Sequence, residues 1–391
     1  MGKQKNIPVL RFPDFIGEWE QKKLGEIFSI FNGYAFASNT TTKEGVLWVK
    51  IADVGIQEMK TDNLSYLPNS FLEKHKKFIL HKGDYVVALT RPILNGKLKI
   101  AQINDFFDGA LLNQRVGKII TDNSQSFIYT LLQKDEIINS IESNIAGSDP
   151  PNLSINEINF ILLSVPTIPE QTHIASFFTV IDKKITELKK KKTLLEQYKK
   201  GVMQKIFSQE FRFKDENGKE FSKWEEKKLG ECLEYEQPTN YLVSSTEYDN
   251  LFEIPVVTAG KTFILGYTNE KHGIYNKELP VIIFDDFTTA SQFVDFPFKA
   301  KSSAMKILKA KGQNNIRFLY EAMQMINYEI GGHGRHWISV FSEMKITFPC
   351  VEEQTKIANF LSAIDEKINH TQTQIEKTEQ WKKGLLQQMF C

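Results

Sequence analysis

Residues 166–207 read PTIPEQTHIASFFTVIDKKITELKKKKTLLEQYKKGVMQKIF, and residues 349–390 read PCVEEQTKIANFLSAIDEKINHTQTQIEKTEQWKKGLLQQMF. The two stretches align without a gap at an offset of 183, and 18 of their 42 positions are identical. An internal repeat of this length indicates that one structural unit is present twice. The rest of the chain then forms two further segments, one in front of each copy.

A shorter repeat opens each of those two segments. Residues 19–26 read WEQKKLGE and residues 224–231 read WEEKKLGE, so seven of eight positions are identical at an offset of 205. The offsets of 205 and 183 differ by 22, so the two variable segments differ in length by 22 residues. Their middles share little sequence, but each ends in an amphipathic helical stretch, a glycine-containing loop, a hydrophobic–Ser pair and a strand that runs into a proline. In chain order, these features lie at 127–141, 146–148, 153–154 and Pro166, and at 316–326, 331–333, 338–339 and Pro349.

The repeated stretches have the apolar spacing of long helices. Apolar residues recur at intervals of three and four from Ile174 to Ile206 and from Ile357 to Met389. This spacing predicts a coiled-coil seam of about five heptads on each helix, with the other helix as its partner. A helix of about 37 residues is roughly 55 Å long, enough to hold two domains at a fixed separation. Polar residues interrupt the seams at Lys192, Lys199, Thr371, Thr378 and Lys382.

Composition and charge restrict the class of function. The chain has 391 residues, so at least two domains are expected. No apolar run is long enough to cross a membrane, and the N-terminus lacks a secretion signal. The three cysteines have neither metal nor disulfide spacing, so a cytoplasmic location is expected. The net charge of +1 excludes a generally basic nucleic-acid coat, so DNA binding would require locally arranged cations.

The repeated motifs together resemble a known family. They are the Trp-Glu…Leu-Gly-Glu entries at 19–26 and 224–231, the Pro-x-x-x-Glu-Gln…Ile-Asp helix starts at 166–182 and 349–365, and the Gln-Tyr/Trp-Lys-Lys-Gly stretches at 197–201 and 380–384. On these motifs, which cover nearly the whole chain, the sequence resembles the specificity subunit of Type I restriction–modification systems.

The resemblance implies an α+β fold with a pseudo-two-fold repeat, in which two target-recognition domains of mixed α/β structure are joined by two long antiparallel coiled-coil helices. The expected segments are a first recognition domain at 1–165, a helix at 166–207, a second recognition domain at 208–348 and a helix at 349–391. Each recognition domain would read one half of a split, asymmetric site in double-stranded DNA. The helices would set the spacer and dock two methyltransferase subunits, which two motor–nuclease subunits can join. S-adenosylmethionine, ATP and Mg²⁺ would belong to those partners, so no catalysis, cofactor or metal is expected in this chain.

The sequence offers only weak candidates for chemistry of its own. Residues 149–152 read DPPN, which approaches a base-holding methyltransferase motif but lacks its aromatic residue and any glycine-rich cofactor loop, so a turn is favoured. Asp285 and Asp286 follow an apolar strand, where turn chemistry is favoured over a metal site. The lysine run 189–192 is best explained as a solvated helix face, with contact to DNA phosphates or an acidic partner as the alternative.

Candidate DNA contacts in the first variable segment follow or precede predicted strands. Arg91 and Lys97 lie in a polar turn after the strand 85–89. Asn113, Gln114 and Arg115 precede another strand, where Asn and Gln could pair with adenine and Arg with guanine. The alternative for Asn113 and Gln114 is that they satisfy backbone groups inside the domain.

The second variable segment offers two groups of candidates. Residues 331–336 read GGHGRH, in which His333, Arg335 and His336 could donate to DNA from a flexible loop. The main alternative is a loop with a purely structural role. Metal ligation by the histidines is less favoured, because no Cys or Asp supports it. The other candidates are small or polar residues near strand ends, namely Lys261, Thr289, Ser291 and Gln292.

Two other classes of function remain open from the sequence. A self-sufficient methyltransferase or nuclease would need a cofactor or metal motif, which the sequence does not show. A coiled-coil adaptor without a DNA role would need only the helices.

Overall fold

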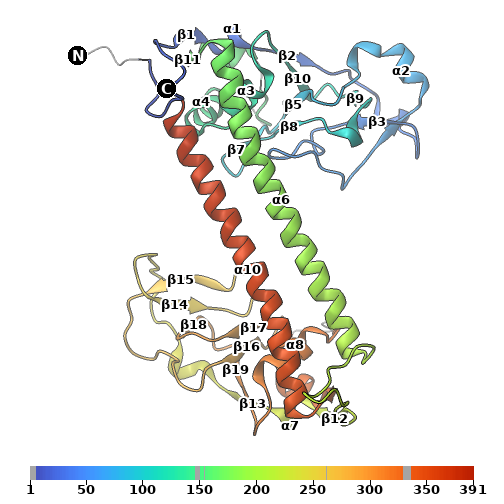
Figure 1. Cartoon of the computed structure of the whole chain (residues 1–391), viewed down its shortest axis with the longest axis vertical. Helices are drawn as coiled ribbons and strands as arrows, with labels where there is room; N and C mark the ends of the chain where they lie inside the picture. Colours follow the sequence, from blue (N-terminus) through green and yellow to red (C-terminus); the bar gives the residue numbers. More distant parts are fainter. Residues whose placement is uncertain (1–5, 146–149, 154, 261, 329–335) are drawn as a thin grey trace. The chain divides into compact units, whose positions relative to one another are not determined.

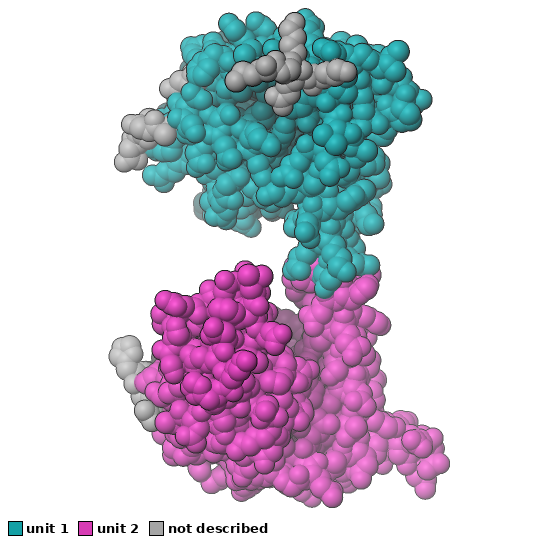
Figure 2. All heavy atoms as spheres, turned by 90° about the vertical axis from the view of Figure 1, so that its left-hand side faces the viewer, with its two compact units in different colours: residues 1–189, 373–391 teal, residues 190–372 magenta. Residues whose placement is uncertain are grey.

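The computed structural model describes residues 6–145, 150–153, 155–260, 262–328 and 336–391. Its elements are labelled in Figure 1, and the predicted combination of helices and strands is confirmed. The chain divides into two compact units (Figure 2). Unit 1 comprises residues 1–189 and 373–391, and unit 2 comprises residues 190–372. Each unit therefore contains one variable segment together with part of both long helices.

The two predicted long helices are α6 (Ile168–Phe207) and α10 (Val351–Gln388). In unit 1, the start of α6 packs against the end of α10, with Phe178 and Leu385 buried in one core. In unit 2, the end of α6 packs against the start of α10, with Ile206 and Leu361 buried together. The helices are therefore antiparallel within each unit, as expected. No helix of the described chain is both long and apolar enough to span a bilayer.

Unit 1 is built on an antiparallel sheet of four strands in the order β2-β10-β5-β8. Alternate residues of a strand point to opposite faces, so each face can bury its own core. Tyr85 and Val87 of β5 join the core that contains α3, α4 and the long helices. Val86 and Ala88 join a second core beneath the sheet β4-β3-β9. The bounds are β2 Ser29–Asn32, β3 Val46–Val49, β4 Tyr66–Leu67, β5 Tyr85–Ala88, β8 Ile100–Gln102, β9 Leu111–Leu112, β10 Val116–Ile120, α3 Gln125–Leu131 and α4 Asp135–Ile145.

Unit 2 repeats this architecture with different residues. Its four-stranded sheet has the order β13-β19-β16-β17, and its smaller sheet has the order β15-β14-β18. Ile282 and Phe284 of β16 face α8 and the long helices, and Val281 and Ile283 face the second core. The bounds are β13 Leu233–Glu236, β14 Ile254–Val257, β15 Ile264–Thr268, β16 Val281–Asp285, β17 Ser291–Val294, β18 Lys299–Ala300, β19 Met305–Ala310 and α8 Ile316–Gln324.

Short elements complete both units. In unit 1 they are β1 Glu20–Lys23, α1 Leu24–Ile27, α2 Ser70–Lys74, β6 Ile93–Leu94, β7 Lys97–Leu98, α5 Ile155–Ile158 and β11 Leu162–Val165, with 3-10 turns at Ser38–Thr40, Lys76–Phe78 and Asp105–Phe107. In unit 2 they are β12 Glu225–Lys228, α7 Leu229–Cys232, α9 His336–Ser339 and β20 Lys345–Phe348, with 3-10 turns at Pro238–Tyr241 and Phe341–Glu343.

The tryptophan of the short sequence repeat contacts the start of a long helix in each unit. In unit 1, the buried Glu170 at the start of α6 accepts hydrogen bonds from Arg11 Nε (2.7 Å) and Trp19 Nε1 (3.2 Å). In unit 2, the buried Glu353 at the start of α10 accepts from Arg212 Nη2 (2.6 Å) and Trp224 Nε1 (3.0 Å). The repeated Trp and Glu residues therefore join each variable segment to a long helix.

Unit 2 is expected to lose stability in mild acid because of Glu270. Burial alone would raise the pKa of this carboxyl group, but hydrogen bonds from Lys299 and from the backbone of Ser245 and Ser244 lower it to about 2. An unfolded glutamate has a pKa of about 4.3, so the stabilisation is complete above that value and is lost as the pH falls from about 5 towards 2. Thermal melts across this range should show a smaller fall in melting temperature for Glu270→Gln than for the wild type. The control Glu225→Gln, which changes an exposed carboxylate of β12, should keep the wild-type slope.

Candidate nucleic-acid interface

One end of the unit 1 sheet brings together residues that are far apart in the sequence. Strand β10 is antiparallel to both neighbours, so its start lies beside the ends of β2 and β5. Gln114 N donates to Tyr34 O (3.0 Å), just after β2, and Leu89 N, just after β5, donates to Arg115 O (2.9 Å). Arg91 follows two residues later, and Lys97 lies shortly before β8, the fourth strand. We call Tyr34, Arg91, Lys97, Gln114 and Arg115 the unit 1 edge.

The turn at 113–115 is held from inside and presents its tip to solvent. Asn113 is buried, and its Oδ1 accepts a hydrogen bond from Arg115 N (3.0 Å). The side chains of Gln114 and Arg115 are exposed and make no hydrogen bond or ion pair with any residue that the structure describes. The DNA contact predicted for Asn113 is therefore replaced by its alternative, the satisfaction of a backbone group, because burial keeps this side chain from a ligand.

Arg91 and Lys97 lie on either side of a small hairpin formed by β6 and β7. Asn95 and Gly96, with φ of 51° and 67°, form its tip, a conformation that suits these two residue types. The side chains of Arg91 and Lys97 are exposed, and neither has an ion-pair partner among the described residues. Both cations are therefore available to an anionic ligand such as a DNA backbone.

The described part of the segment that resembles a methyltransferase motif lies beside the end of β5, where Asn152 forms an isolated antiparallel bridge with Thr90. Asn152 Oδ1 accepts a hydrogen bond from Thr90 Oγ1 (2.7 Å), and Asn152 Nδ2 donates to Pro150 O (2.9 Å). Asp149 lies outside the described residues. The turn favoured for the whole segment therefore stays a prediction.

Sequence reasoning missed an aromatic and basic cluster beside the unit 1 edge. The Tyr34 side chain is 43% exposed, and its ring lies against His75, with the ring centroids 4.3 Å apart. Lys74, directly before that histidine, and Lys77, two residues after it, are exposed and have no ion-pair partner within the described chain. The run of basic residues at 74–77 was a usable signal, but its position beside Tyr34 depends on packing between distant segments.

Unit 2 contains the structural equivalent of the 113–115 turn. Asp286 N donates to Ala304 O (3.0 Å), as Leu89 N does to Arg115 O. Ser302 Oγ accepts from Ala304 N (3.1 Å), as Asn113 Oδ1 does from Arg115 N. Ser303 therefore stands where unit 1 has Gln114. It is exposed and was also missed by the sequence analysis.

The strand end of β16 adds an exposed aromatic residue to this turn. Asp285 Oδ1 accepts hydrogen bonds from Phe287 N (2.9 Å) and Thr288 N (2.8 Å), which agrees with the favoured turn chemistry. The Phe287 side chain is 44% exposed, and Thr288 is exposed. We call Phe287, Thr288 and Ser303 the unit 2 edge. Neither edge includes a group of three His, Cys, Asp or Glu residues that could hold a metal ion, and no such group was found among the described residues.

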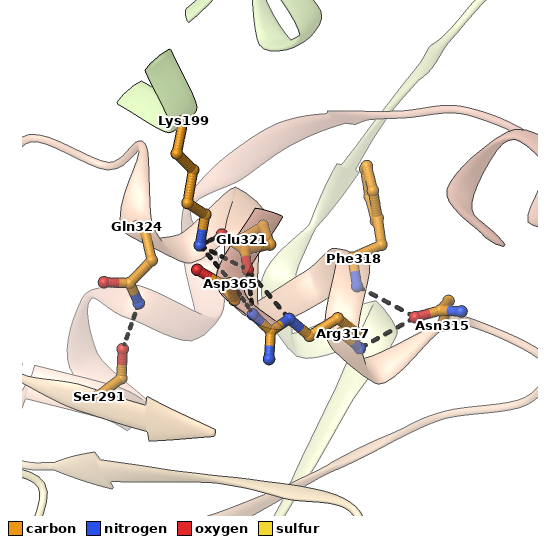
Figure 3. Close-up of polar contacts among 8 residues, drawn as sticks. All are labelled: Lys199, Ser291, Asn315, Arg317, Phe318, Glu321, Gln324 and Asp365. Atoms are coloured by element: carbon orange, nitrogen blue, oxygen red, sulfur yellow. Dashed lines mark hydrogen bonds and ion pairs between the residues drawn. The ribbon is translucent and has the colours of Figure 1, made fainter. Parts of the chain in front are cut away.

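The side chains of Ser291, Gln292 and Thr289 are less available to a DNA ligand than predicted. Ser291 Oγ accepts a hydrogen bond from Gln324 Nε2 (2.8 Å), which Figure 3 shows, and Gln292 Nε2 donates to Gly260 O (3.4 Å). Thr289 is half-buried with a φ of 57°, and its backbone N donates to Asp285 O. These contacts give Ser291 and Gln292 roles inside the unit.

The side chain of His336 does not lie on the surface, in contrast to the prediction that it contacts DNA. His336 is buried, its backbone N donates to Asp286 O (2.9 Å), and its Nδ1 lies 3.4 Å from Tyr328 Oη. Burial between α9 and the sheet keeps this ring from a surface ligand, so we withdraw it as a DNA contact. Lys261, His333 and Arg335 lie outside the described residues.

Asp286 also forms a buried ion pair beneath the unit 2 edge. Its Oδ2 lies 3.2 Å from Lys306 Nζ, and both side chains are almost fully buried. Its Oδ1 accepts from Trp337 N (2.8 Å). At the equivalent positions, unit 1 has Leu89 and Gly117, which are apolar. The two sheets therefore share a register but are stabilised differently.

Comparisons with known proteins point to one family. Residues 16–197 and 221–380 both match the family described as Type I restriction modification DNA specificity domain. The chain is 53% identical over 133 residues to the Type I restriction enzyme EcoR124I/EcoR124II specificity subunit of Escherichia coli, covering 33% of each chain. It is 31% identical over 203 residues to the Type I restriction enzyme MjaVIII specificity subunit of Methanocaldococcus jannaschii, covering 51% of this chain and 48% of that one. These alignments thus span about half or less of either relative.

The fold has a similar counterpart among solved structures. The crystal structure of the Type-I restriction-modification system S subunit from M. genitalium superposes with a TM-score of 0.67, covering 98% of this chain and 99% of that chain. The sequence identity in that comparison is 16%, so the likeness shows a shared fold.

Proposed function

The chain belongs to the family of Type I restriction modification DNA specificity domains, and from this premise we propose that it selects the DNA sites on which a Type I restriction–modification complex acts. Each unit reads one half of a split, asymmetric site in double-stranded DNA through its edge. The long helices set the spacer and dock two methyltransferase subunits. Those partners, and two motor–nuclease subunits where present, supply the catalysis together with S-adenosylmethionine, ATP and Mg²⁺.

One observation carries the proposal: the same sheet end occurs in both units with the same backbone contacts and different exposed side chains. The turn at 113–115 presents the exposed side chains of Gln114 and Arg115, whereas the turn at 302–304 presents that of Ser303. A repeated frame with unlike tips is expected of two readers with different targets. Contacts from such side chains to base edges specify sequence, whereas contacts to phosphates position the protein.

The charges of unit 1 support contact with DNA. Arg91, Lys97 and Arg115 lie around one sheet end, and Lys74 and Lys77 are close in sequence to His75, whose ring contacts Tyr34. Because none of these cations has an ion-pair partner among the described residues, each is available to release counterions from DNA phosphates on binding. This local arrangement accounts for DNA binding by a chain whose net charge is only +1.

The experiment is to express the full chain with its methyltransferase subunit and to map methylated adenines across the host genome. We expect one split, asymmetric motif. Double substitution of Gln114 and Arg115 with alanine should relax one half of the motif and leave the other half intact. Methylation without any split motif would overturn the proposal. A purified chain that binds S-adenosylmethionine and methylates DNA alone would instead support a self-sufficient enzyme, and a motif indifferent to every edge residue would support an adaptor.

A further inference from the structure

Two lysines that interrupt the apolar seams occupy equivalent places in the repeat. Lys199 of α6 and Lys382 of α10 are 183 positions apart, and so are Asp182 of α6 and Asp365 of α10. In unit 1, Lys382 Nζ lies 2.5 Å from Asp182 Oδ1. In unit 2, Lys199 Nζ lies 2.8 Å from Asp365 Oδ2. Each unit therefore joins its two helices by the same Lys–Asp pair, with the helices exchanging roles.

In each unit the variable segment supplies further partners for the lysine. In unit 1, Gln133 Oε1 accepts from Lys382 Nζ (2.5 Å), and Gln57 Oε1 lies 3.3 Å from the same nitrogen. Gln133 lies between α3 and α4, and Gln57 lies beyond β3. We call Lys382, Asp182, Gln133 and Gln57 the unit 1 cluster.

The unit 2 cluster has the same plan with charged partners. Lys199 Nζ lies 3.1 Å from Glu321 of α8, whose side chain is fully buried. Arg317, one turn earlier on α8, pairs with Glu321 at 2.8 Å and also with Asp365, as Figure 3 shows. We call Lys199, Asp365, Glu321 and Arg317 the unit 2 cluster.

Each cluster can form in only one arrangement of α6, α10 and the recognition domain of its unit. The Lys382 side chain is 6% exposed, so its ammonium group must find acceptors inside the protein. Burial lowers the pKa of Lys382, and the neighbouring Asp182 opposes that shift. A shift of one helix by a turn, or a rotation of the recognition domain, would leave this ammonium group buried without acceptors. A polar group in an apolar seam is a known means of fixing register in paired helices.

The buried threonines of the seams do not act in this way. Thr371 Oγ1 donates to Lys367 O and Thr378 Oγ1 donates to Gln374 O, both within α10. Such bonds move with the helix and are satisfied in any register. Lys192 also has its partner on its own helix, because its Nζ lies 3.3 Å from Glu196 Oε1. Among the described residues, Lys199 and Lys382 are thus the two interruptions whose hydrogen bonds and ion pairs reach across to another element.

We propose that Lys199 and Lys382 are positioning residues. Each fixes, in its own unit, the register of the two helices and the position of the recognition domain on them. In this way the two lysines make the complex discriminate between half-site spacings. This inference rests on the proposed function. It adds that the preferred spacing between half-sites depends on two Lys–Asp pairs at equivalent positions of the repeat. The recognition domain of each unit supplies further partners for the lysine of its pair.

The test uses the full chain co-expressed with its methyltransferase subunit. Methylation rates are compared on duplexes that carry the native spacer and on duplexes with the spacer one base pair shorter or longer. We expect Lys382→Met and Lys199→Met each to reduce the preference for the native spacer roughly tenfold or more, a change of about 1.4 kcal/mol per factor of ten. The matched control Lys192→Met removes a seam lysine whose ion-pair partner among the described residues, Glu196, lies on the same helix, and it should keep the preference.

A charge exchange provides a second measurement that does not depend on the stability of the single variants. In unit 1, Asp182→Lys with Lys382→Asp should restore the spacing preference, because the amides of Gln133 and Gln57 can either accept or donate. In unit 2, Asp365→Lys with Lys199→Asp should not restore it, because it places a carboxylate beside Glu321 and an ammonium group beside Arg317.

The outcomes separate this inference from the proposed function. Loss of methylation by the same factor on all spacers, with the preference unchanged, would show a merely structural role and overturn the inference. Restoration by both charge exchanges, or by neither, would also contradict it. Failure of the wild-type complex to methylate any split site would overturn the proposed function instead.

Discussion

Replacing Asp286 with asparagine is expected to destabilise unit 2 by about 3–5 kcal/mol, because it leaves the ammonium group of Lys306 buried without a counter-charge. The amide oxygen can still accept from Trp337 N, so the variant isolates the loss of charge. Hydrogen exchange of the full chain, followed by mass spectrometry on peptides from β16 and β19, should show much faster opening. Peptides from β5 and β10 of unit 1 serve as the internal reference.

The control for this prediction removes both charges together. Asp286→Asn with Lys306→Met keeps the acceptor for Trp337 N and replaces the ammonium group by an apolar end of similar length. Most of the lost stability should return, since buried ion pairs can often be replaced by apolar groups at little cost. The apolar Leu89 and Gly117 at the equivalent positions of unit 1 show that this sheet register does not need the ion pair. A single variant that opens as slowly as the wild type would contradict the prediction.

Replacing Arg115 with alanine is expected to lower methylation at the native site by about fivefold to 150-fold, which corresponds to about 1–3 kcal/mol for a guanidinium group that reads a base. The same variant should change the free energy of unfolding by less than about 0.5 kcal/mol, because the side chain is exposed and has no partner among the described residues. Methylome mapping and thermal melts of the co-expressed complex measure the two effects separately.

The matched control for Arg115→Ala is Lys22→Ala. Lys22 lies on β1, which pairs with β11 and does not belong to the four-stranded sheet. It should leave both the motif and the methylation rate unchanged. An equal loss from both substitutions would indicate a general effect of charge, and an unchanged motif with Arg115→Ala would remove this residue from the reading edge.

The long helices and the repeat could be predicted from the sequence because both depend on local pattern. Apolar spacing along the chain is enough to predict a helix and its buried face, and α6 and α10 confirm that prediction. The segment 113–115 was also recognisable as the stretch before a strand, but the sequence did not separate the buried Asn113 from the exposed Gln114 and Arg115.

The rest of the candidate site depends on packing between distant segments. Tyr34 reaches Gln114 only because β2 pairs with β10, and Ser303 reaches the end of β16 only because β19 pairs with it. The burial of Asn113 and His336, which argues against DNA contact by either side chain, is likewise set by neighbours far away in sequence. Composition and motif spacing carry no information on such pairings.

The turns at 113–115 and 302–304 also affect how such a protein can evolve. Each is anchored by its first residue, through Asn113 Oδ1 or Ser302 Oγ, and each presents the next side chain to solvent. Substitutions at exposed tips usually cost little stability, so many variants of Gln114 or Ser303 should fold equally well. A lineage can therefore explore new targets by point mutation without first acquiring compensating changes in the core. The anchor residues and the long helices, by contrast, should tolerate few replacements.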